Sequence, residues 1–115
     1  MYTVINKTKN RTVVTKAKTA DTFFQRLWGL MLRPGMESEE GLIFYNVSSI
    51  HMFFMRFAID VIFLDKHMRV VKICPALKPW SMAASLKATI TLELPSLKAA
   101  QAQVEIGDTL AFIPH

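Results

Sequence analysis

The chain is 115 residues long, 51% of its residues are hydrophobic and 20% are charged, and its formal net charge is +5 at pH 7. This composition excludes a disordered or fibrous protein, and the length leaves room for one domain, residues 1–115. The longest apolar run, residues 47–64, contains His51, Arg56 and Asp60. Because a charged group at mid-membrane costs about 2.5–3.5 kcal/mol, we expect this run to lie in a protein core and not to span a membrane.

Cysteine usage and the amino-terminal sequence bear on location. Cys74 is the single cysteine, so no internal disulfide can form, which suits a reducing compartment. Residues 1–10, MYTVINKTKN, are polar and β-like, and they lack the basic start and apolar stretch of a signal peptide. The sequence therefore predicts a cytoplasmic protein. It shows no motif for a metal or a cofactor, and it indicates no particular oligomeric state.

The amino-terminal part of the chain has β and helical patterns in turn. β-Branched residues in Tyr2–Ile5 and Thr12–Ala17, separated by an Asn-containing turn, predict a β-hairpin. Apolar residues at helical spacing predict a helix over residues 23–31, which Pro34-Gly35 ends. A short strand is expected within residues 40–47.

The middle of the chain carries the strongest strand pattern. Ile59–Leu64 is dense in Val, Ile and Phe, and it is expected to form the central hairpin with Arg69–Cys74. Prolines at positions 75 and 79 predict a loop, which carries Trp80.

The carboxy-terminal part adds two strands and a helix. Alternation predicts a strand over Ala88–Leu94, Pro95 is expected to open a short helix over Ser96–Val104, and a last strand is expected over Thr109–Ile113. The elements together predict an α+β domain that is mostly β and has two short helices.

Arg56 and Asp60 are unusual polar residues in an apolar segment. If the strand extended through both, they would share a face about 13 Å apart, too far for a direct ion pair, so each would need another partner unless the chain bends near Phe57. We expect Arg26 or Arg33 to pair with Asp60, and Glu93 to pair with Arg56. Such charges act either as structural ion pairs that tie helix to sheet or as a site for an anion or carboxylate.

Three further features each have a functional and a structural interpretation. His51 could act as a general base, but no nucleophile accompanies it, so a surface or hydrogen-bonded histidine is expected. Met52 and Met55 beside His51 could bind copper, although methionines between phenylalanines are more typical of a core. Trp80 could stack on a ligand or cover one end of the sheet.

The positive charge is concentrated at the amino terminus. Five basic residues precede the first acid, Asp21: Lys7, Lys9, Arg11, Lys16 and Lys18. Such a patch could bind phosphate backbones, but no aromatic residue lies among these charges, so the solvated face of a hairpin is the expected role. Nucleic-acid binding through this hairpin stays an alternative.

The chain resembles the family called domain of unknown function 192, a set of small prokaryotic proteins without an assigned activity. The resembling segments are RLWGLMLR (26–33), GLIF (41–44), FFMRFAIDVIFLD (53–65), RVV (69–71), LELP (92–95) and Gly107-Asp108. The resemblance implies a compact, barrel-like mixed sheet with short helices, and it attaches no reaction to any residue. This chain has Ala58 where the family often has Pro, and Ser96-Leu97 where Gly commonly follows LELP. Many relatives have the appearance of exported proteins.

The preferred functional hypothesis is a small non-enzymatic or accessory module that binds an anionic small molecule or a peptide carboxylate. Its polar cleft would lie between the helix over residues 23–31, the block at 53–65 and Glu93. The candidate ligand-binding residues are Arg26, Arg33, His51, Arg56, Asp60 and Glu93. The alternative is a hydrolase-like enzyme that uses His51 or Asp60 as acid-base, which requires the two side chains to meet in one cavity.

Overall fold

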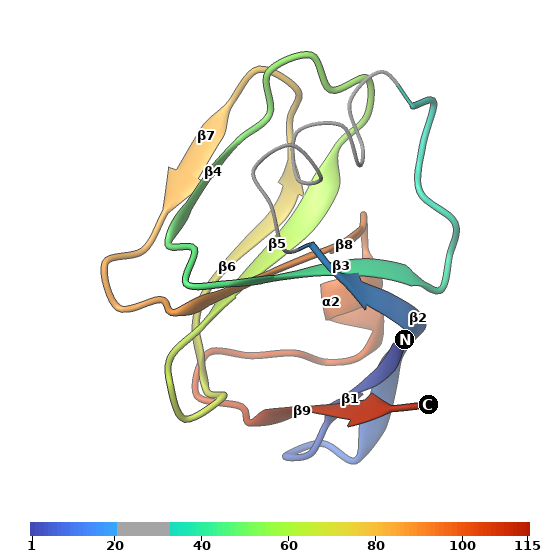
Figure 1. The fold of residues 1–115 in the computed structure, drawn as a ribbon, viewed down its shortest axis with the longest axis vertical. Helices are drawn as coiled ribbons and strands as arrows, with labels where there is room; N and C mark the ends of the chain where they lie inside the picture. Colours follow the sequence, from blue (N-terminus) through green and yellow to red (C-terminus); the bar gives the residue numbers. More distant parts are fainter. Residues whose placement is uncertain (21–32) are drawn as a thin grey trace.

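A seven-stranded sheet forms the body of the molecule in the computed structural model, which describes residues 1–20 and 33–115 (Figure 1). Its strands are β1 (Tyr2–Asn6), β2 (Arg11–Thr19), β3 (Glu40–Tyr45), β5 (Ile59–Leu64), β6 (Val70–Leu77), β8 (Ile90–Pro95) and β9 (Leu110–Pro114). The strand order is β6-β5-β8-β3-β2-β1-β9, in which β2 and β3 are parallel and the other neighbouring pairs are antiparallel. The predicted mixed, mostly β sheet is confirmed.

The sheet curls until its two edge strands meet at one end, which gives a half-barrel (Figure 1). The start of β6 contacts the segment before β9: Val70 N–H donates to the Asp108 carbonyl at 2.8 Å, and Gly107 N–H donates to the Val70 carbonyl at 2.8 Å. An isolated bridge joins Arg69 and Thr109. Gly107 suits this corner because its φ of 94° is one that glycine adopts without strain.

Both expected hairpins are present. Strands β1 and β2 pair with Val4 opposite Val14, and β5 and β6 pair with Ile62 opposite Ile73. However, β6 continues through Pro75 to Leu77, where a loop was expected. The reason is a register shift between the Ile59 and Val61 pairs, because proline is tolerated in a strand at a bulge.

A second, two-stranded sheet was not foreseen from the sequence. It pairs β4 (Ser49–His51) with β7 (Met82–Ala84), and Ile50 lies opposite Ala83. The ribbon stands beside the large sheet in Figure 1. Two strands of three residues carry too little alternation to be recognised, and they come from segments about 30 residues apart.

The expectation of two short helices is not confirmed. Within the described residues there is one short helix, α2 (Lys98–Gln101), which is shorter than the expected span of 96–104. The other expected helix, residues 23–31, lies outside the described residues. Pro95 ends β8 and does not open α2, because Leu97, with φ 78°, places a left-handed residue directly before the helix.

The core has two parts, one on each face of the large sheet. Alternate residues of β5 contribute to both: Ile62 and Leu64 belong to a cluster with Ala99 of α2, whereas Val61 and Phe63 belong to a cluster under the β4–β7 ribbon. All six residues of β5 are consequently buried, as the apolar strand predicted. No helix among residues 1–20 and 33–115 is long and apolar enough to cross a membrane.

Candidate functional site

Asp60 is a buried carboxylate that holds two backbone segments. Its side chain accepts two hydrogen bonds of 2.9 Å, one at Oδ1 from the Ala76 N–H and one at Oδ2 from the Ala99 N–H, and the residue is 1% exposed. Both donors are groups that regular structure leaves without a partner. Ala76, with φ 47°, lies at the bulge of β6, and Ala99 lies in the first turn of α2.

Among the residues that the structure describes, two backbone N–H groups bind the Asp60 carboxylate. Arg33, one candidate for that role, instead binds Glu40 in a bidentate arrangement with two contacts of 2.8 Å. The hydrogen bond from Arg33 lowers the pKa of Glu40 despite partial burial, and it raises that of Arg33. Arg26, the other candidate, lies outside the described residues.

Arg56 and Asp60 do not share a strand face, contrary to expectation. Strand β5 begins at Ile59, so Arg56 precedes it on an exposed irregular segment, and the bend considered near Phe57 is present. Glu93, the expected partner of Arg56, lies opposite Val61 in the register of β8 and β5, whereas Asp60 lies opposite Leu94. Side chains alternate across a sheet, so Glu93 and Asp60 point to opposite faces. Asp60 and Glu93 therefore do not face the same side of the sheet.

His51 lies on β4 and does not form a catalytic pair with Asp60. It is exposed and stacks on Phe53, with ring centroids 4.6 Å apart. The β4–β7 ribbon covers one face of the large sheet, and Asp60 points to the other. Since both Asp60 oxygens are engaged, the geometry does not provide the His51–Asp60 pair that a hydrolase would need.

Two tight turns at one end of the β4–β7 ribbon form the most unusual surface of the described molecule. We call residues 52–55 and 78–81 the aromatic turn pair. Each turn closes with a hydrogen bond of 3.3 Å, Met55 N–H to the Met52 carbonyl in one and Ser81 N–H to the Lys78 carbonyl in the other. The turns are joined because Trp80 N–H donates to the Met52 carbonyl at 2.7 Å and Met52 N–H donates to the Ser81 carbonyl at 2.8 Å.

Each turn places a bulky aromatic residue where glycine is normally found. Phe54, with φ 63°, and Trp80, with φ 68°, occupy the third positions, and the second positions, Phe53 and Pro79, have no positive φ. This is the φ pattern of type II turns, which favour proline at the second position and glycine or asparagine at the third. A left-handed conformation costs an ordinary residue about 1–2 kcal/mol.

The aromatic rings form a contiguous row that faces solvent. Phe53 and Trp80 have ring centroids 5.9 Å apart, and those of Phe54 and Trp80 are 4.9 Å apart. The exposed fractions are 38% for Phe53, 53% for Phe54 and 60% for Trp80, and Met82 on the adjoining strand is 68% exposed. In contrast, Met52 and Met55 are buried in the core, as the second interpretation of these methionines predicted.

Two basic residues adjoin these rings along the chain: Lys78 begins one turn, and Arg56 directly follows the other. Lys72 donates to the Ala84 carbonyl, and Arg69 forms an ion pair with Asp65 at the other end of β6. At the amino-terminal hairpin, by contrast, Lys9 is bound to both Glu105 and Asp108. Lys78 and Arg56 are thus the basic residues next to the aromatic turn pair along the chain.

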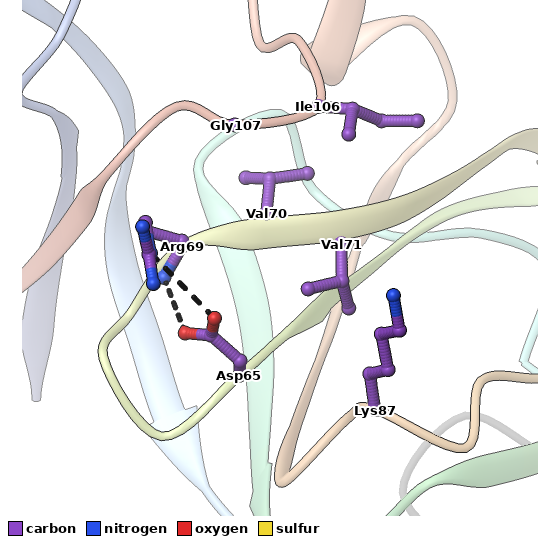
Figure 2. A pocket seen from close by; sticks show the side chains of 7 residues that line it. All are labelled: Asp65, Arg69, Val70, Val71, Lys87, Ile106 and Gly107. Carbon is purple, nitrogen blue, oxygen red and sulfur yellow. Dashed lines mark hydrogen bonds and ion pairs between the residues drawn. The ribbon is translucent and has the colours of Figure 1, made fainter.

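A pocket described in the structure lies elsewhere, beside the corner where the sheet closes. Figure 2 shows the ion pair between Asp65 and Arg69 at one side and Lys87 at another, with Val70 and Ile106 among the apolar lining. Its volume is about 250 Å³. None of the predicted site residues lines it. Within residues 1–20 and 33–115, no group of three or more His, Cys, Asp or Glu side chains is placed to hold a metal ion.

The aromatic turn pair was only partly visible in the sequence. Trp80 was noted as a residue that could stack on a ligand, whereas Phe53 and Phe54 were attributed to the apolar segment. A local signal was present in Lys78-Pro79-Trp80-Ser81, since proline favours the second position of a turn and so places tryptophan at the third.

Comparison with known proteins defines the family. The model for DUF192, described as "Uncharacterized ACR", matches residues 4–112. The chain belongs to the DUF192 family. Among curated relatives, UPF0127 proteins of Thermococcus kodakarensis and Pyrococcus abyssi are 38% and 37% identical; the matches cover 96% and 98% of this chain and 73% and 99% of theirs. The UPF0127 protein of Thermococcus sibiricus is 47% identical over 67% of this chain, which spans about half of that relative (52%). No specific function is established for this family.

Two crystal structures share the DUF192 fold seen here. A protein of unknown function from Novosphingobium aromaticivorans superposes with a TM-score of 0.82 at 22% identity, and the match covers 96% of this chain and 84% of that one. A Sinorhizobium meliloti protein, proposed to be a transcription regulator, superposes with a TM-score of 0.81 at 24% identity over 96% and 91% of the two chains. At these identities the likeness shows the fold alone.

Proposed function

We propose that this DUF192 domain is a non-catalytic binding module and that its aromatic turn pair contacts the partner. The partner carries a negative group beside an apolar one, as an anionic small molecule or a peptide carboxylate does. The observation that carries the proposal is that Phe54 and Trp80 are at once conformationally unfavourable and solvent-exposed.

The positive φ angles of Phe54 and Trp80 lower the stability of the folded chain. At the third position of a type II turn, glycine or asparagine would avoid a penalty of about 1–2 kcal/mol. An aromatic ring there could offset the penalty by burial, but Trp80 remains 60% exposed and recovers only part of it through Phe53 and Phe54. Strained residues of this kind cluster at binding sites, where the strained conformation presents a side chain to a ligand.

Charge supports an anionic partner. Lys78 begins one turn and Arg56 follows the other. Aromatic rings supply contact area with little loss of side-chain entropy, and a neighbouring cation supplies orientation. Both Asp60 oxygens accept backbone hydrogen bonds, so Asp60 does not form the acid-base pair with His51 that the hydrolase alternative requires. This favours binding over catalysis.

Thermal-shift measurements with soluble carboxylates test this proposal. The probes are acetate, benzoate, N-acetylphenylalanine and a short peptide ending in phenylalanine, the last with a free or an amidated carboxyl group. A probe at 100 times its Kd adds about 2.7 kcal/mol, which raises Tm on the order of 10 °C. We expect probes with both a ring and a carboxylate to stabilise the protein, and acetate and the amidated peptide to have little effect.

The matched variant is the double substitution Phe54→Ser and Trp80→Ser, compared with Ile106→Ser. Ile106 is 70% exposed on another loop, so it controls for the loss of an exposed apolar side chain. The proposal requires that the double variant lose the shift and that Ile106→Ser retain it. Equal shifts in both variants, or no shift with any ring-bearing carboxylate, would overturn it.

A further inference from the structure

We infer that the physiological partner of the aromatic turn pair is an anionic lipid bilayer surface. The inference rests on the proposed function, since it uses the same surface and the same chemistry, a negative group beside an apolar one. It goes further by naming the source of both groups, because lipid headgroups supply the charge and the acyl chains beneath them supply the apolar contact.

The exposed rings occupy the parts of the chain that a flat surface can reach. Phe53 and Phe54 are the central residues of one turn, and Trp80 is a central residue of the other. Central residues of tight turns project beyond the strands that they connect. The two hydrogen bonds between Met52 and the second turn hold both tips at the same end of the β4–β7 ribbon, which Figure 1 shows beside the large sheet.

The residue types match those that lie at a membrane interface. Tryptophan is enriched at the boundary between headgroups and acyl chains, and phenylalanine is typical of the apolar face of peripheral anchors. Met82, 68% exposed on the strand that follows Trp80, extends the apolar surface. A left-handed conformation at Phe54 and Trp80 is then explained, because glycine or asparagine would remove the side chains that enter the bilayer.

Charge complementarity selects an anionic bilayer over a neutral one. Lys78 belongs to the turn pair itself, and Arg56 directly follows its other turn. Basic residues close to an anionic membrane add electrostatic attraction, which falls off within a Debye length and is weakened by salt. Apolar insertion and charge attraction together satisfy the need for two signals in peripheral binding.

Co-sedimentation of the full chain with vesicles tests the inference. One set of vesicles contains phosphatidylcholine alone, and the other contains phosphatidylcholine and phosphatidylglycerol in equal parts. We expect binding to the anionic vesicles that is about tenfold or more stronger than to the neutral ones and that weakens with added salt. The Phe54→Ser, Trp80→Ser double variant should bind the anionic vesicles about tenfold more weakly, and Ile106→Ser should match the unsubstituted chain.

Charge and folding have their own controls. Lys78→Glu should weaken binding, whereas Lys7→Glu makes the same charge change on the amino-terminal hairpin and should have a smaller effect. Trp80→Phe keeps an apolar ring, so it should retain most of the binding and lose the blue shift of tryptophan emission that insertion of Trp80 produces. This variant keeps the test decisive if the double variant fails to fold.

The outcomes separate this inference from the proposed function. Binding of ring-bearing carboxylates at the turn pair without binding to anionic vesicles overturns the bilayer and leaves the binding module intact. Equal binding to both kinds of vesicle, or vesicle binding that neither turn-pair variant changes, also overturns the bilayer inference. Failure of the ring-bearing carboxylates to bind overturns the proposed function, whether or not the vesicles bind.

Discussion

Asp60 and the aromatic turn pair each place a residue where its type is unfavourable, but in opposite ways. Asp60 is a charged side chain that is 1% exposed, whereas Trp80 is a large apolar side chain that is 60% exposed and has a strained backbone. The Asp60 carboxylate is fully accounted for by its surroundings, because two backbone N–H groups donate to it. The exposed rings contact each other and leave much of their surface without a protein partner.

The difference separates structural from functional anomalies. A buried charge whose hydrogen bonds are all supplied by the fold stabilises that fold, and its removal should change stability. An exposed apolar group in a strained turn contributes little to stability, and its removal should change binding. The sequence drew attention to Asp60 as a candidate site residue, whereas the site that we propose consists of Phe53, Phe54 and Trp80.

The largest expected effect follows removal of the Asp60 carboxylate. Asp60→Ala leaves the N–H groups of Ala76 and Ala99 without their acceptor, so it should lower the free energy of unfolding by roughly 3 kcal/mol. Urea denaturation measures the change. Asp65→Ala is the matched control, since Asp65 Oδ1 also accepts two backbone N–H groups, at 2.8 and 3.0 Å, but at an exposed turn.

The control should lose only about 1 kcal/mol, because water can replace an exposed acceptor. Equal losses in the two variants would contradict the structural role assigned to burial at Asp60. A bilayer-binding or ligand-binding defect in Asp60→Ala protein that remains fully folded would return Asp60 to the functional site.

A smaller change in the free energy of unfolding is expected when acid protonates Asp108, a second buried carboxylate. Burial raises the pKa of the Asp108 carboxyl, but hydrogen bonds from Lys9, the Glu105 N–H and Asn6, with the charge of Lys9, bring that pKa below its ordinary value of 3.8. The folded pKa is thus lower than the unfolded one. Its contribution to stability is present above about pH 3.8 and is lost as the pH falls through the folded pKa.

Asp108→Asn should therefore reduce the loss of unfolding free energy between about pH 6 and about pH 3. Denaturant unfolding at both pH values measures it. If the acid dependence of the variant equals that of the unsubstituted protein, Asp108 is not one of the carboxylates that acid protonates on unfolding. Binding at the aromatic turn pair should be unaffected, which distinguishes this buried acid from the exposed rings.

In contrast to Asp60 and Asp108, the exposed rings should contribute mainly to binding and little to stability. Trp80→Asn relieves a left-handed conformation that costs about 1–2 kcal/mol and loses two ring contacts worth about 0.5–1.5 kcal/mol each. The net change in the free energy of unfolding should therefore lie between a gain of about 1 kcal/mol and a loss of about 2 kcal/mol. The same variant should bind anionic vesicles several-fold more weakly. A loss of more than about 3 kcal/mol, as for a core residue, would instead make Trp80 part of the fold.

The smallest effect concerns Leu97, which also has a positive φ but has no ring partner. Leu97 is 62% exposed with φ 78°. Leu97→Gly should raise the free energy of unfolding by about 0.5–1 kcal/mol, as measured by thermal unfolding, because glycine adopts this conformation without strain. No change in vesicle binding is expected. Altered binding would extend the functional surface to the start of α2.

Much of the fold could be predicted because it depends on local patterns. Ile59–Leu64 had the composition of a buried strand, and the opening hairpin had its turn residues, so both elements and their pairing were foreseen. The bulge at Pro75 was not foreseen, because the proline indicated a loop. Only the register of β5 and β6 shows that the strand continues. The strand over Ile59–Leu64 was predicted with its observed bounds, and Arg56 precedes it at the bend that was considered near Phe57.

The candidate site was harder to predict, because it depends on which backbone groups lack partners. Nothing in the residues near Asp60 showed that the N–H groups of Ala76 and Ala99, 16 and 39 positions away, would meet its two oxygens. Similarly, Phe54 and Trp80 are 26 positions apart, and the two hydrogen bonds of Met52 bring their turns together.

By itself, the sequence determined the family, the mostly β class and the order of the main strands, because apolar alternation and turn chemistry act over a few residues. Only the tertiary structure decided the roles of the polar and aromatic residues. Distant segments place groups around Asp60 that decide whether it binds a ligand or accepts structural hydrogen bonds. They likewise decide whether Trp80 lies in the core or on the surface. Hydrogen-bond partners and burial are determined only when distant segments pack together, so no local sequence pattern predicts them.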